Sequence, residues 1–229
     1  MGFYDYHLHS ENLEETIKTA KILGFSGICI SHNWVDLSSL EKFRKSLEPH
    51  KKQIDMVIGV EIKDKQNRIP VIVEKIRGLA EIILVHGGDL EVNRVSVETK
   101  GVDILLHPEL GREDPGLNHV IVNLAEKNNV AIEFSLNDII QSSKITRARL
   151  FEKMLFNAKL VKKYKAPFVL TSGAFDSLWM RSPSELTGLG HLLGFSDPQI
   201  KRSLSDSFVK ENRKRLSKNW VMPGVEIVE

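Results

Sequence analysis

The sequence has one cysteine, no long hydrophobic run and no glycine-rich phosphate-binding motif. Because Cys29 has no partner within the chain, an internal disulfide framework is excluded, and the reducing cytoplasm is the expected location. The longest apolar runs, such as residues 80–85, have the length of a strand and are too short to span a membrane, so no membrane association is expected. No basic segment followed by an apolar stretch opens the chain, so no signal peptide is expected.

Acidic residues are scarce in the C-terminal part of the chain, although the net charge is only +2. Residues 1–143 contain 16 Lys and Arg against 22 Asp and Glu, whereas residues 144–229 contain 16 against 8. Most of the basic excess lies in residues 144–165 and 199–218. RNA phosphates favour such clusters, because docked cations release counterions. For either stretch alone, a solvated helix face is the alternative.

Short apolar segments alternate with amphipathic ones along the chain. Repeated β–α units imply parallel strands. We therefore predict an α/β fold, a TIM-barrel-like (β/α) barrel of about seven parallel strands, in one domain over residues 1–229 with a basic helical part from about 196. We expect no eighth strand after residue 195, and no G-x-G-x-x-G or Walker motif supports an open nucleotide-binding sheet. The predicted strands are 3–9, 27–31, 55–62, 81–86, 102–107, 130–136 and 167–172, and the predicted helices are 12–24, 38–47, 67–78, 89–100, 117–129, 144–165, 182–194 and 198–217. Capping boxes are predicted at Ser38–Glu41 and Ser182–Glu185.

Histidines and carboxylates collect at the expected C-terminal ends of these strands. Asp5, His7 and His9 alternate, so an extended strand presents them on one face. Functional groups of a parallel barrel gather at this end. Imidazoles with a carboxylate suit zinc or manganese, although a structural or vestigial cluster is the alternative. The predicted metal ligands are His7, His9, Glu61, His86 and His107, and His32 and Glu133 occupy equivalent positions.

The pattern Asp5-x-His7-x-His9 resembles the opening motif of the polymerase-and-histidinol-phosphatase (PHP) superfamily of metal phosphoesterases. Its later motifs resemble His32, Gly59-x-Glu61 and His107-Pro108. The final motif differs, because residues 172–175 read Ser-Gly-Ala-Phe where the superfamily has Ser-Asp-Ala-His. Glycine and phenylalanine offer no metal donor, so a hydrolytic centre that needs both ligands is incomplete.

Three stretches carry a second resemblance: GVDILLHPELGREDPGLNHVIVNLAEKNNVAIEFSL at 101–136, the RARL and LVKKYKAPFVLTS segments within 147–172, and WMRSPSEL at 179–186. Together they are similar to the archaeal ribonuclease P protein component 3 family. The resemblance implies a PHP-like barrel and a role in removing the 5′ leader from precursor tRNA, with an RNA as the catalytic part. It further implies that the chain binds ribonuclease P RNA, component 2 and other protein subunits, and meets precursor tRNA within the particle. No catalytic residue and no required cofactor are assigned to the chain itself, although binding of a residual zinc or manganese ion is an alternative.

Basic positions of that family are matched by Arg94, Arg112, His119, Lys127, Arg147 and Arg181. The resemblance implies that these residues contact RNA, and the two basic stretches add Lys163 and Lys201. For Arg112 the alternative is an ion pair with Glu113 or Asp114. Two other functions stay open at this point: a free-standing PHP-type metal-dependent phosphoesterase, and a general RNA-binding module outside any particle.

Overall fold

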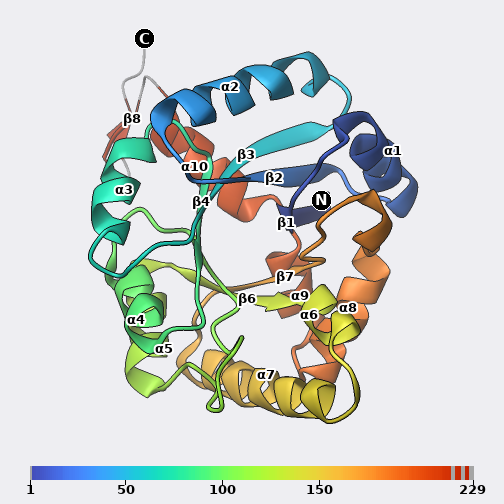
Figure 1. Cartoon of the computed structure of the whole chain (residues 1–229), viewed down its shortest axis with the longest axis vertical. Coiled ribbons are helices and arrows are strands. Elements are labelled where there is room, and N and C mark those ends of the chain that lie inside the picture. The colour runs from blue at the N-terminus through green and yellow to red at the C-terminus, as the bar shows by residue number, and fades with distance from the viewer. Residues whose placement is uncertain (1, 218–219, 223–224, 227–229) are drawn as a thin grey trace.

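Seven short parallel strands form one sheet that curls into a nearly closed barrel (Figure 1). The computed structural model describes residues 2–217, 220–222 and 225–226. The strands pair in chain order, and the sheet closes where Leu8 pairs with Ala174, downstream of the last strand. The predicted TIM-barrel-like fold is thereby confirmed. The strands are β1 (Tyr4–Leu8), β2 (Gly27–Asn33), β3 (Asp55–Ile62), β4 (Ile82–His86), β5 (Ile104–Leu106), β6 (Ala131–Ser135) and β7 (Phe168–Thr171).

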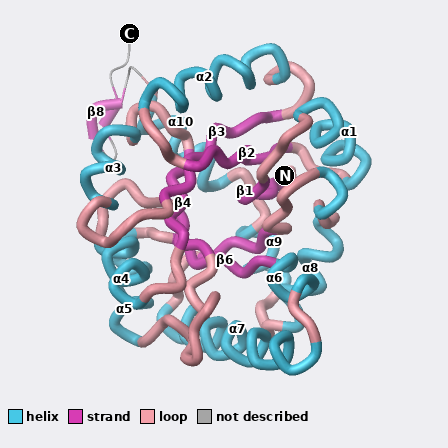
Figure 2. The backbone as a smooth tube through the Cα atoms, in the orientation of Figure 1, coloured by secondary structure: helices cyan, strands magenta, loops and turns pink. Residues whose placement is uncertain are grey.

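Helices surround the barrel on its outside (Figure 2). They alternate with the strands as predicted, and α6 is an additional short helix directly after β6. Within the described residues, no helix has the length and apolar character needed to cross a membrane. The helices are α1 (Leu13–Leu23), α2 (Leu37–Leu47), α3 (Ile69–Ile76), α4 (Leu90–Glu98), α5 (His119–Asn128), α6 (Leu136–Gln141), α7 (Lys144–Tyr164), α8 (Pro183–Leu192), α9 (Asp197–Ser203) and α10 (Ser207–Leu216), with single 3₁₀ turns η1 (Glu48–His50) and η2 (Ser177–Trp179).

Alternate residues of each strand face opposite sides of the barrel wall. Cys29 of β2, Val57 of β3 and Val169 of β7 belong to the core inside the barrel. Their neighbours Ile28 and Ile58 pack outward in the core beneath the helices. Because both faces are buried, the strands read as continuous apolar runs in the sequence. The inward rows end at the C-terminal end of the barrel, where functional groups are expected.

Of the two predicted capping boxes, one forms and one does not. The capping box Ser182–Glu185 of α8 forms as predicted. The predicted box at Ser38–Glu41 is wrong, because α2 begins one residue earlier and Asp36 is its N-cap. The Asp36 carboxylate already accepts the Ser39 amide hydrogen at 2.7 Å, which satisfies the first turn of the helix.

The single helix predicted over 198–217 is wrong, because α9 and α10 are separate. The barrel binds the backbone between them: the Tyr4 amide donates to the Leu204 carbonyl at 2.8 Å, and the Tyr6 hydroxyl donates to the Ser205 carbonyl. α10 then lies under the N-terminal end of the barrel, where Val209 joins the inner core. Beyond it, β8 (Trp220–Met222) and β9 (Val225–Glu226) form a separate antiparallel pair that we did not predict.

Candidate functional site

The C-terminal end of the barrel holds a buried cluster of imidazoles and carboxylates. The inward rows of β3, β4 and β6 end there in Glu61, His86 and Glu133. His7 comes from β1, and His9 and His107 directly follow β1 and β5. All five predicted metal ligands therefore meet at one place. The side chains that meet are His7, His9, Glu61, His86, His107 and Glu133.

Glu61 links three imidazoles. Its Oε2 lies 3.0 Å from His9 Nε2 and 3.5 Å from His7 Nε2. Its Oε1 lies 2.9 Å from His86 Nδ1. Burial by itself raises the pKa of a carboxyl group, but the three neighbouring imidazoles outweigh it and hold the pKa of Glu61 well below its usual range. Glu61 is therefore a carboxylate at neutral pH.

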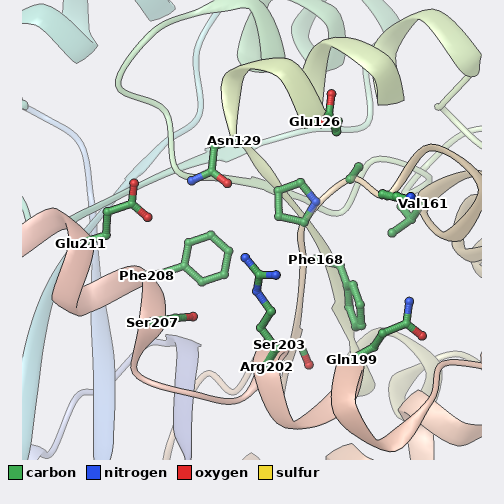
Figure 3. Close-up of a pocket in the computed structure, with 13 residues that line it drawn as sticks. Glu126, Asn129, Val161, Phe168, Gln199, Arg202, Ser203, Ser207, Phe208 and Glu211 are labelled. Carbon is green, nitrogen blue, oxygen red and sulfur yellow. The ribbon is translucent and has the colours of Figure 1, made fainter. Parts of the chain in front are cut away.

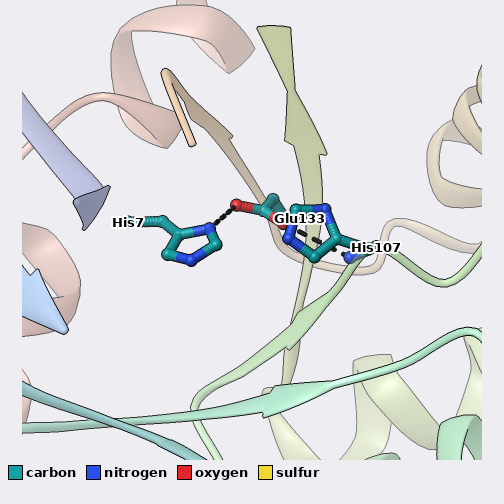
Figure 4. Close-up of side chains that lie close together, drawn as sticks. All are labelled: His7, His107 and Glu133. Carbon is teal, nitrogen blue, oxygen red and sulfur yellow. Dashed lines mark hydrogen bonds and ion pairs between the residues drawn. The ribbon is translucent and has the colours of Figure 1, made fainter. Parts of the chain in front are cut away.

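Glu133 is the second carboxylate, and it is fully enclosed between His7 and His107 (Figure 4). Its Oε1 lies 2.7 Å from His7 Nδ1 and accepts the Thr171 hydroxyl at 2.6 Å. Its Oε2 lies 3.3 Å from His107 Nδ1. Burial raises its pKa, but the two imidazoles and Thr171 prevail and lower the pKa of Glu133 to about 2.

His107 has a backbone conformation that is unusual for its residue type. Its φ is 46°, in the left-handed region that non-glycine residues rarely occupy, and Pro108 follows it. Asp138 of α6 binds its Nδ1 at 2.6 Å. Burial opposes the positive charge, but Glu133 and Asp138 raise the pKa of His107 to about 9. Backbone strain of this kind persists where surrounding contacts fix it, and it collects at functional sites.

His7 lies at the centre of the cluster and has one nitrogen without a hydrogen bond. His7 Nδ1 is bound by Glu133, while Nε2 has no hydrogen-bond partner among the described residues. Donor atoms of His7, His9 and Glu61 lie within 4.8 Å of one another, as do those of His7, His107 and Glu133. Burial lowers the pKa of His7, but Glu133 and Glu61 raise it well above its ordinary value. The arrangement can hold a cation, and without one the raised pKa values of His7 and His107 favour protons on these two imidazoles.

The alternation predicted that Asp5 shares one face of β1 with the imidazoles, and this prediction is wrong. The pairing of β1 with β2 shifts register between Asp5 and Leu8. The buried Asp5 carboxylate instead accepts the Ser172 amide hydrogen at 3.2 Å. Burial raises the pKa of Asp5 to about 6. Asp5 therefore ties β1 to the segment after β7 and helps to close the barrel.

The segment after β7 cannot supply the two ligands that the PHP motif requires. Gly173 has φ +62°, and a Cβ there would meet Ser135 Oγ at 2.3 Å. An aspartate at this position would therefore collide with the end of β6. Phe175 is 54% exposed and lies at the surface. Glycine at 173 and phenylalanine at 175 both suit the local structure, and they leave this side of the cluster without the two metal ligands of the motif.

His32 is separate from the cluster, although its sequence position suggested the same role. It shares the outward row of β2 with Ile28 and Ile30, and its ring stacks on Phe43 of α2 with centroids 4.8 Å apart. Its Nε2 lies 3.0 Å from Ser39 Oγ. Counting in twos from the apolar outward residues would have identified this orientation.

Two members of the cluster were missed by the sequence reasoning. Asp138 is on α6, a helix that we did not predict, so its position beside His107 had no local signal. Thr171 ends the inward row of β7. The same alternation that places Val169 inside the barrel would have placed Thr171 beside Glu133.

Four of the basic residues predicted to contact RNA lie at the C-terminal end of the barrel, where strands lead into helices. Arg112 is not free: its guanidinium binds Asp114 at 2.7 and 2.6 Å and the Gly88 carbonyl at 3.2 Å, so the ion-pair alternative is the one observed. Arg147 donates to three carbonyls at the end of α6. Arg181 donates to Met180 O at 2.8 Å. The fourth residue, His119, is exposed at the start of α5.

The other basic residues lie elsewhere on the barrel. Lys127 near the end of α5, Lys163 near the end of α7, and Lys201 on α9 are exposed towards the N-terminal end. Arg94 is exposed on α4 and pairs with Glu98 at 2.9 Å. Lys218, at the end of the second basic stretch, lies outside the described residues. The predicted RNA contacts therefore do not form one compact patch.

Comparison with known proteins gives a consistent result over nearly the whole chain. The model of a family described as RNase P subunit p30 matches residues 2–216. Ribonuclease P protein component 3 of Methanococcus maripaludis is 36% identical over 94% of this chain and 94% of the relative. The protein of the same name from Methanococcoides burtonii is 35% identical over 100% of this chain and 95% of the relative. A chain in the cryo-EM structure of archaeal ribonuclease P with mature tRNA superposes with a TM-score of 0.86, at 28% identity and 98% coverage of both chains.

Proposed function

The chain belongs to the RNase P subunit p30 family, and we therefore propose that it acts as an RNA-binding protein subunit of ribonuclease P. The superposition on a chain of an archaeal ribonuclease P carries the proposal, because it extends over 98% of both chains. The substrate of the particle is precursor tRNA, and the reaction is hydrolysis of the phosphodiester that joins the 5′ leader. The RNA of the particle supplies the catalysis, and this chain assists it.

The RNA path that we propose runs along α5 and α7. These helices are neighbours on the outside of the barrel. Each has a basic side chain in its first turn, at the C-terminal end of the barrel, and an exposed lysine in its last turn, at the N-terminal end. These are His119 and Lys127 on α5, and Arg147 and Lys163 on α7. A polyanion that follows the two helices would meet cations at both ends of the barrel. Its binding would be largely electrostatic and would weaken as salt increases.

A reconstitution experiment tests the proposed function. The ribonuclease P RNA and its protein subunits are assembled with and without this chain, and the rate of 5′ leader removal from precursor tRNA is measured. We expect slower cleavage when the chain is omitted and recovery when it is added back. An equal rate in both assemblies would contradict the proposal.

For its protein neighbour, we propose ribonuclease P protein component 2, and for its location the cytoplasm. The proposed partner follows from the family membership. The proposed location follows from the single buried cysteine, Cys29, which forms no disulfide. Native extract from a cell that carries the chain, purified through a tag on the chain, should contain component 2 and the ribonuclease P RNA. Recovery of the RNA without component 2 would remove the proposed pairing and leave the RNA role intact.

We also propose that the histidine–carboxylate cluster binds one divalent ion, with zinc the best fit. The donors are His7 Nε2, His9 Nε2 and Glu61 Oε2, which converge within 4.8 Å. The unpartnered Nε2 of the buried His7 supports this assignment, because a buried nitrogen without a hydrogen bond is unfavourable. Glu133 on the other nitrogen of His7 would fix the ring orientation, as carboxylates behind metal-bound histidines do. His86 and His107 would act as neighbours that orient the two carboxylates.

A further inference from the structure

A pocket at the N-terminal end of the barrel lies at the far end of the proposed RNA path (Figure 3). Its volume is about 370 Å³, within the range of small-ligand pockets. The last residues of α5 and α7 form one wall, the start of β7 forms the floor, and α9 and α10 form the opposite wall. The histidine–carboxylate cluster lies at the other end of the barrel, so the two sites are separate.

Phe208 gives the pocket a flat apolar face. Its ring is half-buried and meets Tyr6 edge to face, with centroids 5.9 Å apart. This contact fixes the ring while it still lines the pocket. Pro167 and Phe168 add apolar surface at the floor. A planar ligand can therefore stack against a ring that is already held in place, which reduces the entropy lost on binding.

The polar lining of the pocket is largely free to bind a ligand. Arg202 and Lys165 make no ion pair or side-chain hydrogen bond with any described residue, and the same holds for Glu126 and Glu211. Figure 3 draws Arg202 and Phe208 among the side chains that line the pocket. The pocket thus combines a stacking face with two cations and two carboxylates, and these four charged side chains have no partner in the described part of the chain.

Exposed lysines lie next to this lining in the sequence. Lys127 follows Glu126, Lys201 precedes Arg202, and Lys163 is two residues before Lys165. These lysines are the three predicted RNA contacts that lie towards the N-terminal end of the barrel. A phosphate chain that runs over these lysines would pass the mouth of the pocket.

We propose that the pocket takes up one unpaired nucleotide of the RNA, with its base against Phe208 and its phosphate beside Arg202 and Lys165. The inference rests on the proposed function and adds a defined contact to it. Single-stranded nucleotides bind proteins through this combination of aromatic stacking and backbone cations. A protein side chain is the other possible occupant, but the three lysines next to the lining favour a polyanion.

The carboxylates predict which bases enter. Glu126 and Glu211 only accept hydrogen bonds when ionised, so they select a base with an exocyclic amino group. Adenine, cytosine and guanine have such a group, whereas uracil presents carbonyl oxygens in its place. Arg202 and Lys165 bind the phosphate of any nucleotide. The pocket should therefore prefer oligoadenylate or oligocytidylate to oligouridylate.

Fluorescence anisotropy of the full chain with labelled single-stranded oligonucleotides tests the proposal. Phe208→Leu keeps the apolar volume and removes the stacking face, and we expect about tenfold weaker binding of oligoadenylate. Arg202→Ala, at an exposed position that leaves the fold intact, should weaken binding and reduce the salt slope by about one. Glu211→Gln should reduce the preference over oligouridylate. Lys18→Ala, which removes one exposed charge from α1, is the matched control and should bind as the wild type does.

The outcomes distinguish the pocket proposal from the proposed role as a ribonuclease P subunit. If the wild-type chain supports leader cleavage and binds the oligonucleotides, but Phe208→Leu and Arg202→Ala bind them equally well, the pocket proposal is wrong and the subunit role stands. Loss of capture of a partner protein by these two variants, with RNA binding unchanged, would assign the pocket to a protein side chain and overturn the proposal. If the wild-type chain neither supports cleavage nor binds RNA, both proposals fail together.

Discussion

Arg112 binds Asp114 through two parallel hydrogen bonds, from Nε to Oδ1 at 2.7 Å and from Nη2 to Oδ2 at 2.6 Å. Asp114 Oδ1 also accepts the Gly116 amide hydrogen at 2.7 Å, and Lys153 of α7 donates to the Arg112 carbonyl. Bidentate arginine–carboxylate pairs fix geometry as well as charge. The pair therefore shapes the loop between β5 and α5, and we expect Arg112 to act on RNA binding through that loop.

The first prediction separates loop shape from direct RNA contact. Arg112→Ala should slow precursor tRNA cleavage by the reconstituted particle, and the barrel should stay folded by circular dichroism. Asp114→Ala should slow cleavage by a similar factor, because it removes the same pair. If Asp114→Ala instead leaves cleavage unchanged or faster while Arg112→Ala slows it, the freed guanidinium binds RNA directly. The Arg181 guanidinium donates through Nη1 to the Leu178 and Met180 carbonyls. Arg181→Ala should therefore slow cleavage without changing the loop between β5 and α5.

The second prediction concerns salt. Lys127, Lys163 and Lys201 are exposed at the N-terminal end. Replacing any one of them with Ala should weaken RNA binding and reduce the slope of log affinity against log salt by about one, because one phosphate is no longer neutralised. Filter binding across a salt series measures this slope. Lys42→Ala on α2, also exposed, is the control; an equal reduction of the slope in the control would mean that only total charge matters.

The third prediction concerns metal. Protein purified without chelator should contain close to one divalent ion per chain by elemental analysis, and the His7→Ala/His9→Ala double variant should contain much less. His32→Ala is the matched control, because His32 packs on Phe43 outside the cluster. Equal metal content in the wild type and the double variant would show that the cluster is a proton-holding structural network.

The fourth prediction is that the isolated chain does not hydrolyse phosphate esters. A metal centre for hydrolysis needs enough ligands to hold its ions and an open position for water. The segment after β7 supplies neither of the two ligands that the PHP motif has there, because Gly173 has no side chain and Phe175 faces solvent. The purified chain is assayed with zinc or manganese against small phosphate monoesters and precursor tRNA. Turnover that His7→Ala abolishes would establish a phosphoesterase within this chain.

The fifth prediction concerns acid stability at the N-terminal end of the barrel. Burial by itself raises the pKa of Asp55, but hydrogen bonds from Arg213 and Tyr4 prevail and lower it. A carboxyl whose pKa is lower in the folded state contributes stability above its unfolded pKa and loses it as pH falls through the folded pKa. Asp55→Asn should reduce the free energy of unfolding at neutral pH by about 1–2 kcal/mol and flatten its dependence on pH below about 4.

Denaturant unfolding at a series of pH values measures this effect. Asp64→Asn is the control, because the Asp64–Arg68 pair is a surface pair within one turn of chain and such pairs contribute little. If Asp55→Asn unfolds with the same acid dependence as the wild type, the contact between Arg213 and Asp55 does not set the acid stability.

Sequence periodicity was sufficient for the barrel and for most of the histidine cluster. Strands buried on both faces give continuous apolar runs, so their number and order can be counted. The C-terminal ends of parallel strands share one edge, so His7, Glu61 and His107 could be placed together from the sequence. The same rule failed for His32, because the direction of a side chain within the barrel wall depends on which row of alternate residues faces inward.

Local pattern and chain order were enough to predict the seven-unit barrel and most of the residues that meet at its C-terminal end, and the resemblance of three stretches indicated the family. The contacts of the charged groups, in contrast, are decided only in the folded chain. Arg112 and Asp114 are two residues apart, and nothing in their spacing distinguishes an ion pair from a free RNA contact. Glu126, Lys165 and Arg202 are far apart in the chain, and the packing of α5, α7 and α9 around β7 brings them into the lining of one pocket. Long-range packing sets these contacts, and it leaves no local trace in the sequence.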